Sequence, residues 1–377
     1  MSKAMRIAIV RRALQASLSM DVYADGLVSG LKTVRPDWEI LELAPIAAQK
    51  QKRSSLLNGL GKYYQRYWHY PQTVKKQEVD IFHVIDHSDG HLVYWLKNTG
   101  KPIIVTCHDL INFLQPENVS SQAIIPSVSM AAWKYAVRGI RQANRIITVS
   151  AHTAKDAVKL LDVKREDLIV VPNAVESIFY PLSETQIEVF RRQHHISPET
   201  ICLLNVGSNQ PRKNVFTILK ALGILKEQKL PFHFWKAGAD FTVEQKQFIQ
   251  THNLEDFVSY LGKPDKSILV QLYNAADVLI APSVYEGFGM TILEAMACGT
   301  AVITSNVTSL PEVAGDAAIL VNPTDVLAIA KAVRHLYEDS SYRQSLVEQG
   351  LARVKLFSWE QTAEKVAQVY EKVIGDT

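Results

Sequence analysis

The sequence PSVYEGFGMTILEAMACG, residues 282–299, follows a short apolar run from Val278 to Ala281. The apolar run predicts a buried strand, and the stretch from about Met290 to Gly299 predicts a helix. Between them, Gly287 and Gly289 leave backbone N–H groups approachable, and the helix N-terminus adds positive potential. The stretch therefore predicts a strand, a turn and a helix of an α/β domain that binds a diphosphate without a metal.

Two carboxylates flank this glycine turn: Glu286 stands just before it, and Glu294 lies about one turn inside the helix. Carboxylates repel a phosphate, but ionised carboxylates accept two hydrogen bonds from the vicinal hydroxyl groups of a sugar. A nucleotide sugar has this layout, because ribose and hexose lie on either side of its diphosphate. The alternative is a strand, turn and helix with an exposed glutamate at each end, because short glycine motifs are common.

A second polar loop, NVGSNQPRKN at residues 205–214, follows the apolar run that begins at Ile201. Arg212 and Lys213 stand beyond the carboxyl end of the predicted strand, where they can neutralise a leaving diphosphate. Most adjacent Arg-Lys pairs are simply solvated, and that is the alternative here. The place of this pair after a strand favours the first interpretation, because ligands of parallel α/β sheets bind there.

Short apolar runs alternate with longer amphipathic stretches along the chain, which is typical of parallel sheets covered by helices. Strands are predicted in two series. The first contains Arg6–Val10, Glu39–Leu43, Ile81–Val84, Ile103–Cys107, Arg145–Val149 and Leu168–Val171, and the second contains Ile201–Val206, Phe232–Ala237, Val258–Leu261, Val278–Ala281 and Ala301–Thr304. The length of 377 residues exceeds what one hydrophobic core usually organises. The sequence therefore predicts an α/β protein of two Rossmann-like domains.

The polar stretch Pro172–Pro198 carries few strand signals and is predicted to link the domains. We expect an N-terminal Rossmann-like domain at residues 1–180 and a C-terminal one at residues 181–356. Residues 357–377 place a serine and a glutamine at capping-box spacing before a helical pattern, and predict a helix that packs back towards the N-terminal domain. Two facing domains of this kind are expected to form a cleft at the carboxyl ends of their strands.

The composition is that of a soluble globular enzyme, with 47% hydrophobic and 21% charged residues. The N-terminus lacks a signal-peptide pattern, and no apolar run is long enough to span a bilayer. Cys107, Cys202 and Cys298 are far apart in apolar surroundings, which argues against a disulfide framework. These features predict a cytoplasmic protein, and we expect no nucleic-acid partner.

Glu286 and Glu294, with seven intervening residues, and the Arg-Lys-Asn loop resemble the signature of the retaining glycosyltransferases of the GT-B fold, family four. The resemblance covers essentially the whole chain and implies that Glu286 meets hexose hydroxyls and Glu294 the ribose diol. The catalytic residues that it implies are His108, Arg212, Lys213 and Glu286, and the donor-binding residues are Gly207, Gly287, Phe288, Gly289, Met290, Thr291 and Glu294.

This chain departs from the family pattern at three places. Met290-Thr291 stands where members often carry Leu-Pro, and Ser208 stands where many carry an arginine after the glycine. The first loop, Arg11–Met20, has no glycine, whereas many relatives have a glycine-rich turn there. The second departure means that one cationic contact to the diphosphate is either missing or supplied differently.

In the first half of the chain, His108 and Asp109 follow the predicted strand that ends at Cys107. A lone histidine after a strand is more often structural, but the resemblance implies that His108 contacts and positions the transferred sugar. Asp109 and Asp86 are predicted to bind acceptor hydroxyl groups, and their alternative role is to cap a helix N-terminus. Two serines of the first loop are also predicted to line the acceptor side, namely Ser17 and Ser19.

The sequence contains no Asp-x-Asp motif and no Cys/His cluster with metal-ligand spacing. We therefore expect a metal-independent reaction without a cofactor, in which the donor is a GDP-mannose or UDP-glucose type of nucleotide sugar. Retention is implied by the resemblance, and front-side attack is favoured because no family-matched carboxylate is an obvious nucleophile. A nucleotide-sugar hydrolase or epimerase and a non-catalytic nucleotide-sugar binder are the alternatives.

No acidic residue lies between Leu43 and Gln77, where basic and aromatic residues alternate. This mixture suits the headgroup region of an anionic membrane, and would make the acceptor a lipid or a lipid-linked saccharide. It equally suits a solvated basic helix whose aromatic side packs on the domain core. The basic residues are Lys50, Lys52, Arg53, Lys62, Arg66, Lys75 and Lys76.

Overall fold

The computed structural model describes residues 5–13, 18–45, 61, 63–114 and 126–375. The chain forms two compact units, Met1–Ala174 with Trp359–Thr377, and Val175–Ser358. The predicted boundary after residue 180 therefore lies six residues inside the second unit. This difference has a physical cause, because Phe179 is buried in the core of the second unit.

The first unit holds a six-stranded parallel sheet in the order β2-β1-β3-β4-β5-β6. Its strands are β1 (Arg6–Val10), β2 (Glu39–Leu43), β3 (Ile81–Val84), β4 (Ile103–Cys107), β5 (Arg145–Thr148) and β6 (Leu168–Val170). Its α-helices are α1 (Leu18–Val34), α3 (Tyr70–Lys75), α4 (Leu92–Leu96), α5 (Ile111–Leu114), α7 (Pro126–Arg138), α8 (Ala151–Leu161) and α17 (Trp359–Gly375). Short turns of π or 3₁₀ helix are η1 (Gln65–His69), η2 (His87–Asp89), η3 (Lys97–Thr99), η4 (Gly139–Gln142) and η5 (Arg165–Asp167).

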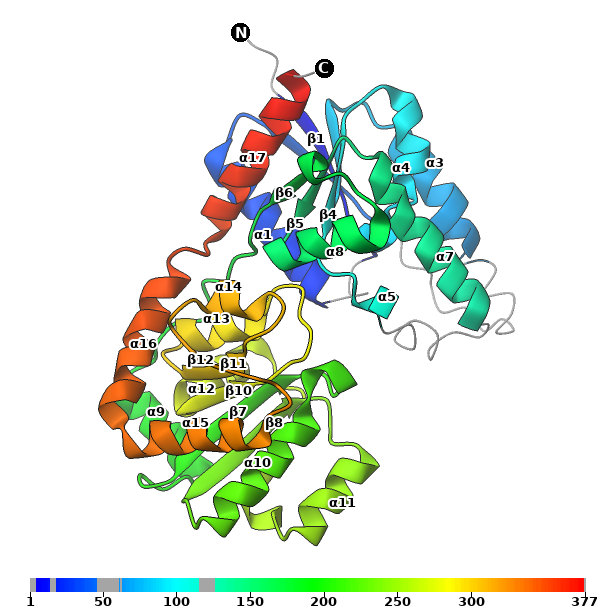
Figure 1. Ribbon diagram of the computed structural model, residues 1–377. Coiled ribbons are helices and arrows are strands. Elements are labelled where there is room, and N and C mark those ends of the chain that lie inside the picture. Colours follow the sequence, from blue (N-terminus) through cyan, green and yellow to red (C-terminus); the bar gives the residue numbers. More distant parts are fainter. Residues whose placement is uncertain (1–4, 14–17, 46–60, 62, 115–125, 376–377) are drawn as a thin grey trace. The chain divides into compact units, whose positions relative to one another are not determined.

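Alternate side chains of the first sheet pack on opposite faces, as a strand requires. Ile7 and Ile9 pack on the face covered by α1 and α17, and Ala8 and Val10 pack on the face covered by α3, α4 and α8. Figure 1 shows α17, the red helix, running beside α1. The two helices approach closely at Gly26, because a Cβ there would overlap the Trp359 ring.

The second unit holds another six-stranded parallel sheet, in the order β12-β11-β10-β7-β8-β9. Its strands are β7 (Ile201–Gly207), β8 (Phe232–Gly238), β9 (Val258–Tyr260), β10 (Val278–Ala281), β11 (Ala301–Ser305) and β12 (Ile319–Val321). Its helices are α9 (Glu184–Gln193), η6 (Pro211–Lys213), α10 (Val215–Glu227), α11 (Val243–Thr251), η7 (Glu255–Phe257), α12 (Lys266–Ala275), α13 (Met290–Ala297), α14 (Leu310–Ala314), α15 (Val326–Glu338) and α16 (Ser340–Val354). This strand order is that of a doubly wound Rossmann sheet.

Every strand predicted from the sequence is present, and each predicted end lies within one residue of the observed end. The sequence analysis missed β12, although the apolar run Ala317–Val321 with the Asn-Pro that follows it is a signal that could have found this strand. No helix among the described residues is both long and apolar enough to cross a membrane. Of the basic segment that ends at Gln77, residues 46–60 and 62 lie outside the described residues.

Candidate active site

In the second unit, β7 and β10 are neighbouring strands. The strand that follows β7 in the chain, β8, pairs with its other side, and β11, which follows β10, pairs with the other side of β10, so the sheet grows outward in both directions from this pair. Ligands of parallel α/β sheets bind at such a switch point, beyond the carboxyl ends of the strands. The loops that follow these two strands are tied together. The Val284 N–H donates to the Arg212 carbonyl (2.8 Å), and the Asn214 side-chain amide donates to the Pro282 carbonyl (3.0 Å). The two polar stretches of the sequence analysis therefore form one surface.

Arg212, Lys213 and Glu286 are in direct contact on this surface. Glu286 Oε2 lies 2.8 Å from Arg212 Nη1, and Glu286 Oε1 lies 2.6 Å from Lys213 Nζ. Burial by itself raises the pKa of Glu286, but Lys213 and Arg212 outweigh burial, so this pKa lies below its ordinary value. Glu286 is therefore ionised at neutral pH, with one carboxylate oxygen paired with Arg212 and the other with Lys213.

The glycine turn at residues 287–289 leads directly into α13. Gly289 has a φ of +117°, a conformation that residues with a side chain rarely adopt. The Ser309 hydroxyl lies 2.9 Å from the Glu286 carbonyl and 2.8 Å from the Phe288 carbonyl, and it fixes the turn from behind. The Phe288 side chain is buried, so only the backbone of this residue is available to contact a nucleotide-sugar donor.

The other predicted donor-binding residues border the same surface. Gly207 ends β7 with a φ of +134°, and a Cβ on it would lie 3.6 Å from Lys213 Cε. The Lys213 side chain therefore extends over Gly207. Met290 and Thr291 form the first turn of α13 and are partly exposed. Gly287 is partly exposed as well, so the exposed part of this stretch lies at the positive, N-terminal end of α13.

Glu294 lies one turn further along α13 and accepts a hydrogen bond from the Tyr273 hydroxyl of α12 at 2.7 Å. Burial raises the pKa of Glu294, and the bond from Tyr273 opposes this shift without cancelling it. The Tyr273 ring is fully buried. Sequence reasoning missed Tyr273, because a tyrosine in an amphipathic stretch gives no signal beyond a core position.

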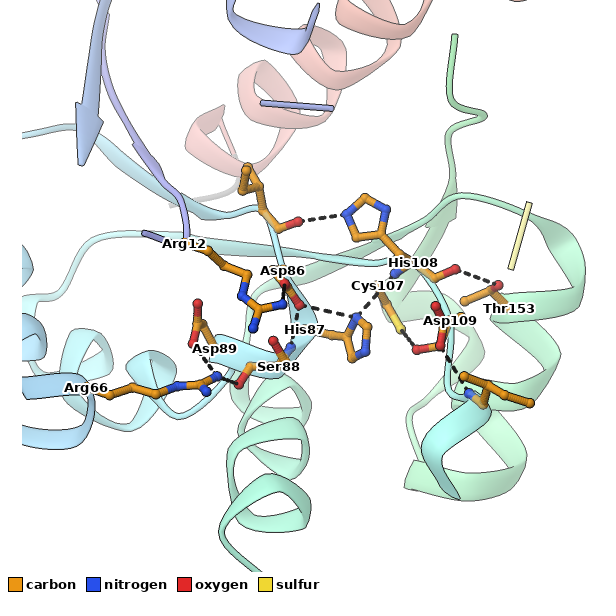
Figure 2. Close-up of polar contacts among 12 residues, drawn as sticks. Arg12, Arg66, Asp86, His87, Ser88, Asp89, Cys107, His108, Asp109 and Thr153 are labelled. Carbon is orange, nitrogen blue, oxygen red and sulfur yellow. Dashed lines mark hydrogen bonds and ion pairs between the residues drawn. The ribbon is translucent and has the colours of Figure 1, made fainter. Parts of the chain in front are cut away.

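A second polar cluster lies in the first unit, at the carboxyl ends of β1, β3 and β4 (Figure 2). Asp86 is buried, its Oδ1 accepts the Ser88 N–H at 2.8 Å, and its Oδ2 lies 3.2 Å from Arg12 Nη1. Burial raises the pKa of Asp86, but His87 and Arg12 outweigh burial and hold this pKa below its ordinary value. The bond from Ser88 makes Asp86 the N-cap of η2, as the alternative interpretation of this residue expected.

His108 is buried directly after β4, and its Nε2 lies 2.8 Å from the Ile85 carbonyl. Because a carbonyl only accepts, Nε2 carries a proton and Nδ1 is the acceptor of the neutral ring. Burial lowers the pKa of His108, although the Asp86 carboxylate opposes this shift. The Tyr23 ring meets the imidazole edge-on, with centroids 4.7 Å apart. The neutral imidazole is therefore held in one orientation by its own unit.

The remaining predicted acceptor residues have simpler surroundings. Asp109 Oδ1 accepts the Ile111 N–H, the first N–H of α5, at 3.2 Å. Ser19 is exposed in the first turn of α1, and Ser17 lies outside the described residues. Acceptor binding by these residues stays a prediction. Sequence reasoning missed Arg12, although its place two residues after a predicted strand is a signal that could have found it.

The predicted site residues are divided between the two units. The second unit brings Arg212, Lys213 and Glu286 together, with Glu294 nearby on α13, and the first unit holds His108. In the part of the chain that the structure describes, no three His, Cys, Asp or Glu side chains gather as a set of metal ligands.

Two family models match this chain, one in the second unit and one largely in the first. Residues 186–353 match Glycosyl transferases group 1, and residues 33–177 match Glycosyltransferase Family 4. The chain belongs to the group 1 glycosyltransferases. The predicted family, the GT-B fold and the class of hexosyltransferases are confirmed.

Among its relatives, O-antigen chain mannosyltransferase B of Escherichia coli is 29% identical over 285 residues, which cover 74% of this chain and 72% of the relative. Serotype-specific mannosyltransferase WbdA of Escherichia coli is 26% identical over 310 residues, which cover 78% of this chain and 37% of WbdA. The solved structure of Anabaena HepE in complex with UDP and glucose is 17% identical, with a TM-score of 0.76, over 98% of this chain and 100% of HepE. This last likeness shows the fold alone.

Proposed function

We propose that this group 1 glycosyltransferase moves a hexose from a nucleotide diphosphate sugar to a saccharide or lipid-linked acceptor, with retention of configuration and without a metal. One observation carries the proposal: Arg212 and Lys213 meet on Glu286 at the switch point of the second sheet, beside the N-terminus of α13. Two cations and a helix terminus supply the positive charge that a leaving diphosphate needs.

In the proposed reaction, the bond from the anomeric carbon to the diphosphate breaks, and a bond to the acceptor oxygen forms on the same face. The acceptor hydroxyl passes its proton to a diphosphate oxygen. Arg212 and Lys213 stabilise the negative charge on the diphosphate, and Glu286 accepts hydrogen bonds from the hexose hydroxyls. The neutral His108 positions the sugar through a hydroxyl contact, because its oriented Nδ1 can accept a hydrogen bond.

The names of the relatives support a mannosyl donor. Two of the relatives described above are mannosyltransferases, and a third mannosyltransferase, from Mycolicibacterium hassiacum, is 28% identical over 285 residues, or 73% of this chain and 66% of that protein. HepE is described as a complex with UDP and glucose. We therefore propose GDP-mannose as the first donor to test and UDP-glucose as the second.

The test supplies radiolabelled GDP-mannose or UDP-glucose, with and without a lipid extract or a mannose-containing oligosaccharide. We expect label to move from one donor into the acceptor, and NMR of the product to show the anomeric configuration of the donor. Release of free sugar at the same rate with and without acceptor would instead support a hydrolase. Binding without any turnover would support a non-catalytic nucleotide-sugar binder.

We also propose that the first unit contacts an anionic membrane through an aromatic surface, defined as Tyr63, Tyr64, Trp68, Tyr94, Trp95 and Tyr135. Trp68 meets Trp95 edge-on with centroids 5.2 Å apart, and Tyr94 meets Tyr135 at 4.9 Å. These contacts join η1, α4 and α7, and Tyr64, Trp68 and Tyr135 are each more than half exposed. Large amphipathic rings of this kind favour the interface of a bilayer.

The charge of the same segments supports an anionic surface as the partner. Residues 63–77, 90–101 and 126–142 contain no acidic residue. Their basic residues are Arg66, Lys75, Lys76, Lys97, Lys101, Lys134, Arg138 and Arg141. A basic residue near an anionic bilayer contributes about 1 kcal/mol, and salt screens this contribution.

Co-sedimentation with vesicles of neutral or anionic phospholipid tests the membrane contact. We expect binding to anionic vesicles that weakens as salt rises, and weaker binding when Lys134 and Arg138 are replaced by Gln. Lys331→Gln in α15 of the second unit is the matched control, because Lys331 is an exposed lysine outside these segments. Equal sedimentation with both kinds of vesicle would favour a soluble acceptor.

A further inference from the structure

Lys236 is a fully buried lysine at the carboxyl end of β8. Lysines are rarely buried, because removing an ammonium group from water costs free energy unless the group is paired. In the part of the chain that the structure describes, no carboxylate forms an ion pair with Lys236. Its Nζ donates instead to two backbone carbonyls, that of Gly207 and that of Ala237, each at 2.9 Å.

The Gly207 carbonyl is held by two donors from the β8 side. Besides Lys236, the Ala239 N–H donates to it at 3.0 Å. Gly238 makes this close approach possible, since a Cβ there would overlap the Gly207 carbonyl. In a trans peptide the C=O and the following N–H point in opposite directions, so this arrangement directs the Ser208 N–H away from Lys236.

Lys213 is a second cation near Lys236. Burial lowers the pKa of Lys236 to about 8, Lys213 adds to this shift, and Asp240 opposes it without cancelling it. Asp240 is itself exposed and paired with Lys246 at 2.6 Å. The buried carboxylate on this side, Glu286, is already shared by Arg212 and Lys213. An anion bound over Gly207 would therefore relieve repulsion between the lysines.

We propose that Lys236 is a positioning residue of the donor site, which fixes the Gly207 turn and adds positive charge behind it for the diphosphate of the nucleotide sugar. The proposal rests on the proposed function. Lys236 also gives the turn a positive charge although residue 208 is a neutral serine. The buried ammonium of Lys236 supplies positive charge beneath the same turn.

The test compares the binding of nucleoside diphosphates and monophosphates by calorimetry, with GDP and GMP as one pair and UDP and UMP as the other. In Lys236→Met, affinity for the diphosphate should fall at least tenfold, whereas affinity for the monophosphate should fall less than threefold. Lys226→Met is the matched control, because Lys226 Nζ also donates to two backbone carbonyls, those of His252 and Asn253 at 2.8 Å, at the far end of α10. The control should leave both affinities unchanged.

Equal losses for diphosphate and monophosphate in Lys236→Met, or no loss, would overturn the role of Lys236. A wild-type protein that binds neither GDP nor UDP would instead contradict the proposed donor. If Lys236→Met does not fold, the wild-type protein still decides the question through pH. A bound diphosphate favours the charged form of Lys236, and free Lys236 loses its charge as pH rises above about 8. The affinity of the protein for the diphosphate should therefore fall above pH 8, while its affinity for the monophosphate changes much less. Equal pH profiles would contradict the proposal.

Discussion

The two polar clusters of this chain sit at equivalent places, beyond the carboxyl ends of parallel strands, but their side chains are held in different ways. In the second unit the principal contacts join side chains, with Glu286 bound to both Arg212 and Lys213. In the first unit Asp86 also pairs with Arg12, but His108 and Asp86 are each bonded to the backbone as well: His108 donates to the Ile85 carbonyl, and Asp86 accepts the Ser88 N–H.

This difference indicates which cluster changes on binding a ligand. Ion pairs between side chains can exchange partners when a diphosphate arrives, because the ligand replaces one anion with another around the same cations. Bonds to the backbone fix a side chain in place before any ligand is present. We therefore expect the second unit to control donor affinity, and the first unit to control the position of the transferred sugar.

The largest effect is expected in the cluster of the second unit. Glu286→Ala and Lys213→Ala should each lower turnover at least tenfold, about 1.4 kcal/mol of transition-state stabilisation, because each removes a proposed contact to hexose or diphosphate. Steady-state rates with the identified donor measure the loss, and circular dichroism checks that the fold is intact. Near-normal rates in both variants would show that the donor site lies elsewhere.

The variant His108→Ala is expected to change turnover without changing the affinity for the nucleoside diphosphate. Turnover should fall about tenfold, since the neutral imidazole no longer positions the sugar, a loss of about 1.4 kcal/mol. The affinity for the nucleoside diphosphate should stay within about twofold of wild type, because the cations proposed to bind it belong to the second unit. Calorimetry and rates together test this. A tenfold weaker diphosphate affinity in His108→Ala would contradict the expectation that the second unit alone controls donor affinity.

A smaller effect is expected from Tyr273→Phe, which removes the hydroxyl bonded to Glu294 and leaves the ring in place. The loss of one hydrogen bond of about 1 kcal/mol corresponds to a rise of about fivefold in KM for the donor, with kcat nearly unchanged. Measuring KM for donors with a modified ribose tests the role of Glu294 more directly. If Glu294 binds the ribose diol, a 2′-deoxy donor should show little further change in the variant.

No effect is expected from chelation. EDTA should leave activity intact, because Arg212, Lys213 and the N-terminus of α13 are proposed to carry the charge of the diphosphate. Rates with and without EDTA measure this. Complete loss on chelation, restored by Mn²⁺ or Mg²⁺, would contradict the proposed phosphate site.

The sequence predicted the strands and the main polar loops because each rests on local information. Apolar runs mark β7 and β10, and the polar residues that follow them must reach the same edge of a parallel sheet. The contact of Glu286 with both Arg212 and Lys213 depends on side-chain directions across more than 70 residues, which no spacing reveals. Lys236 was missed for another reason: a lysine at a strand end usually reaches solvent, whereas this one is buried and donates to the Gly207 and Ala237 carbonyls.

The Trp359 ring packed over Gly26 also bears on how the chain folds during synthesis. The second unit is one continuous segment, Val175–Ser358, and can fold as soon as that segment has left the ribosome. The first unit is assembled from two segments, and α17 closes over Ile7 and Ile9 of its core. Although its sheet is synthesised first, the first unit therefore completes its core last, after residues 359–375 emerge. Until then, the apolar face that α17 covers is exposed to chaperones and to aggregation.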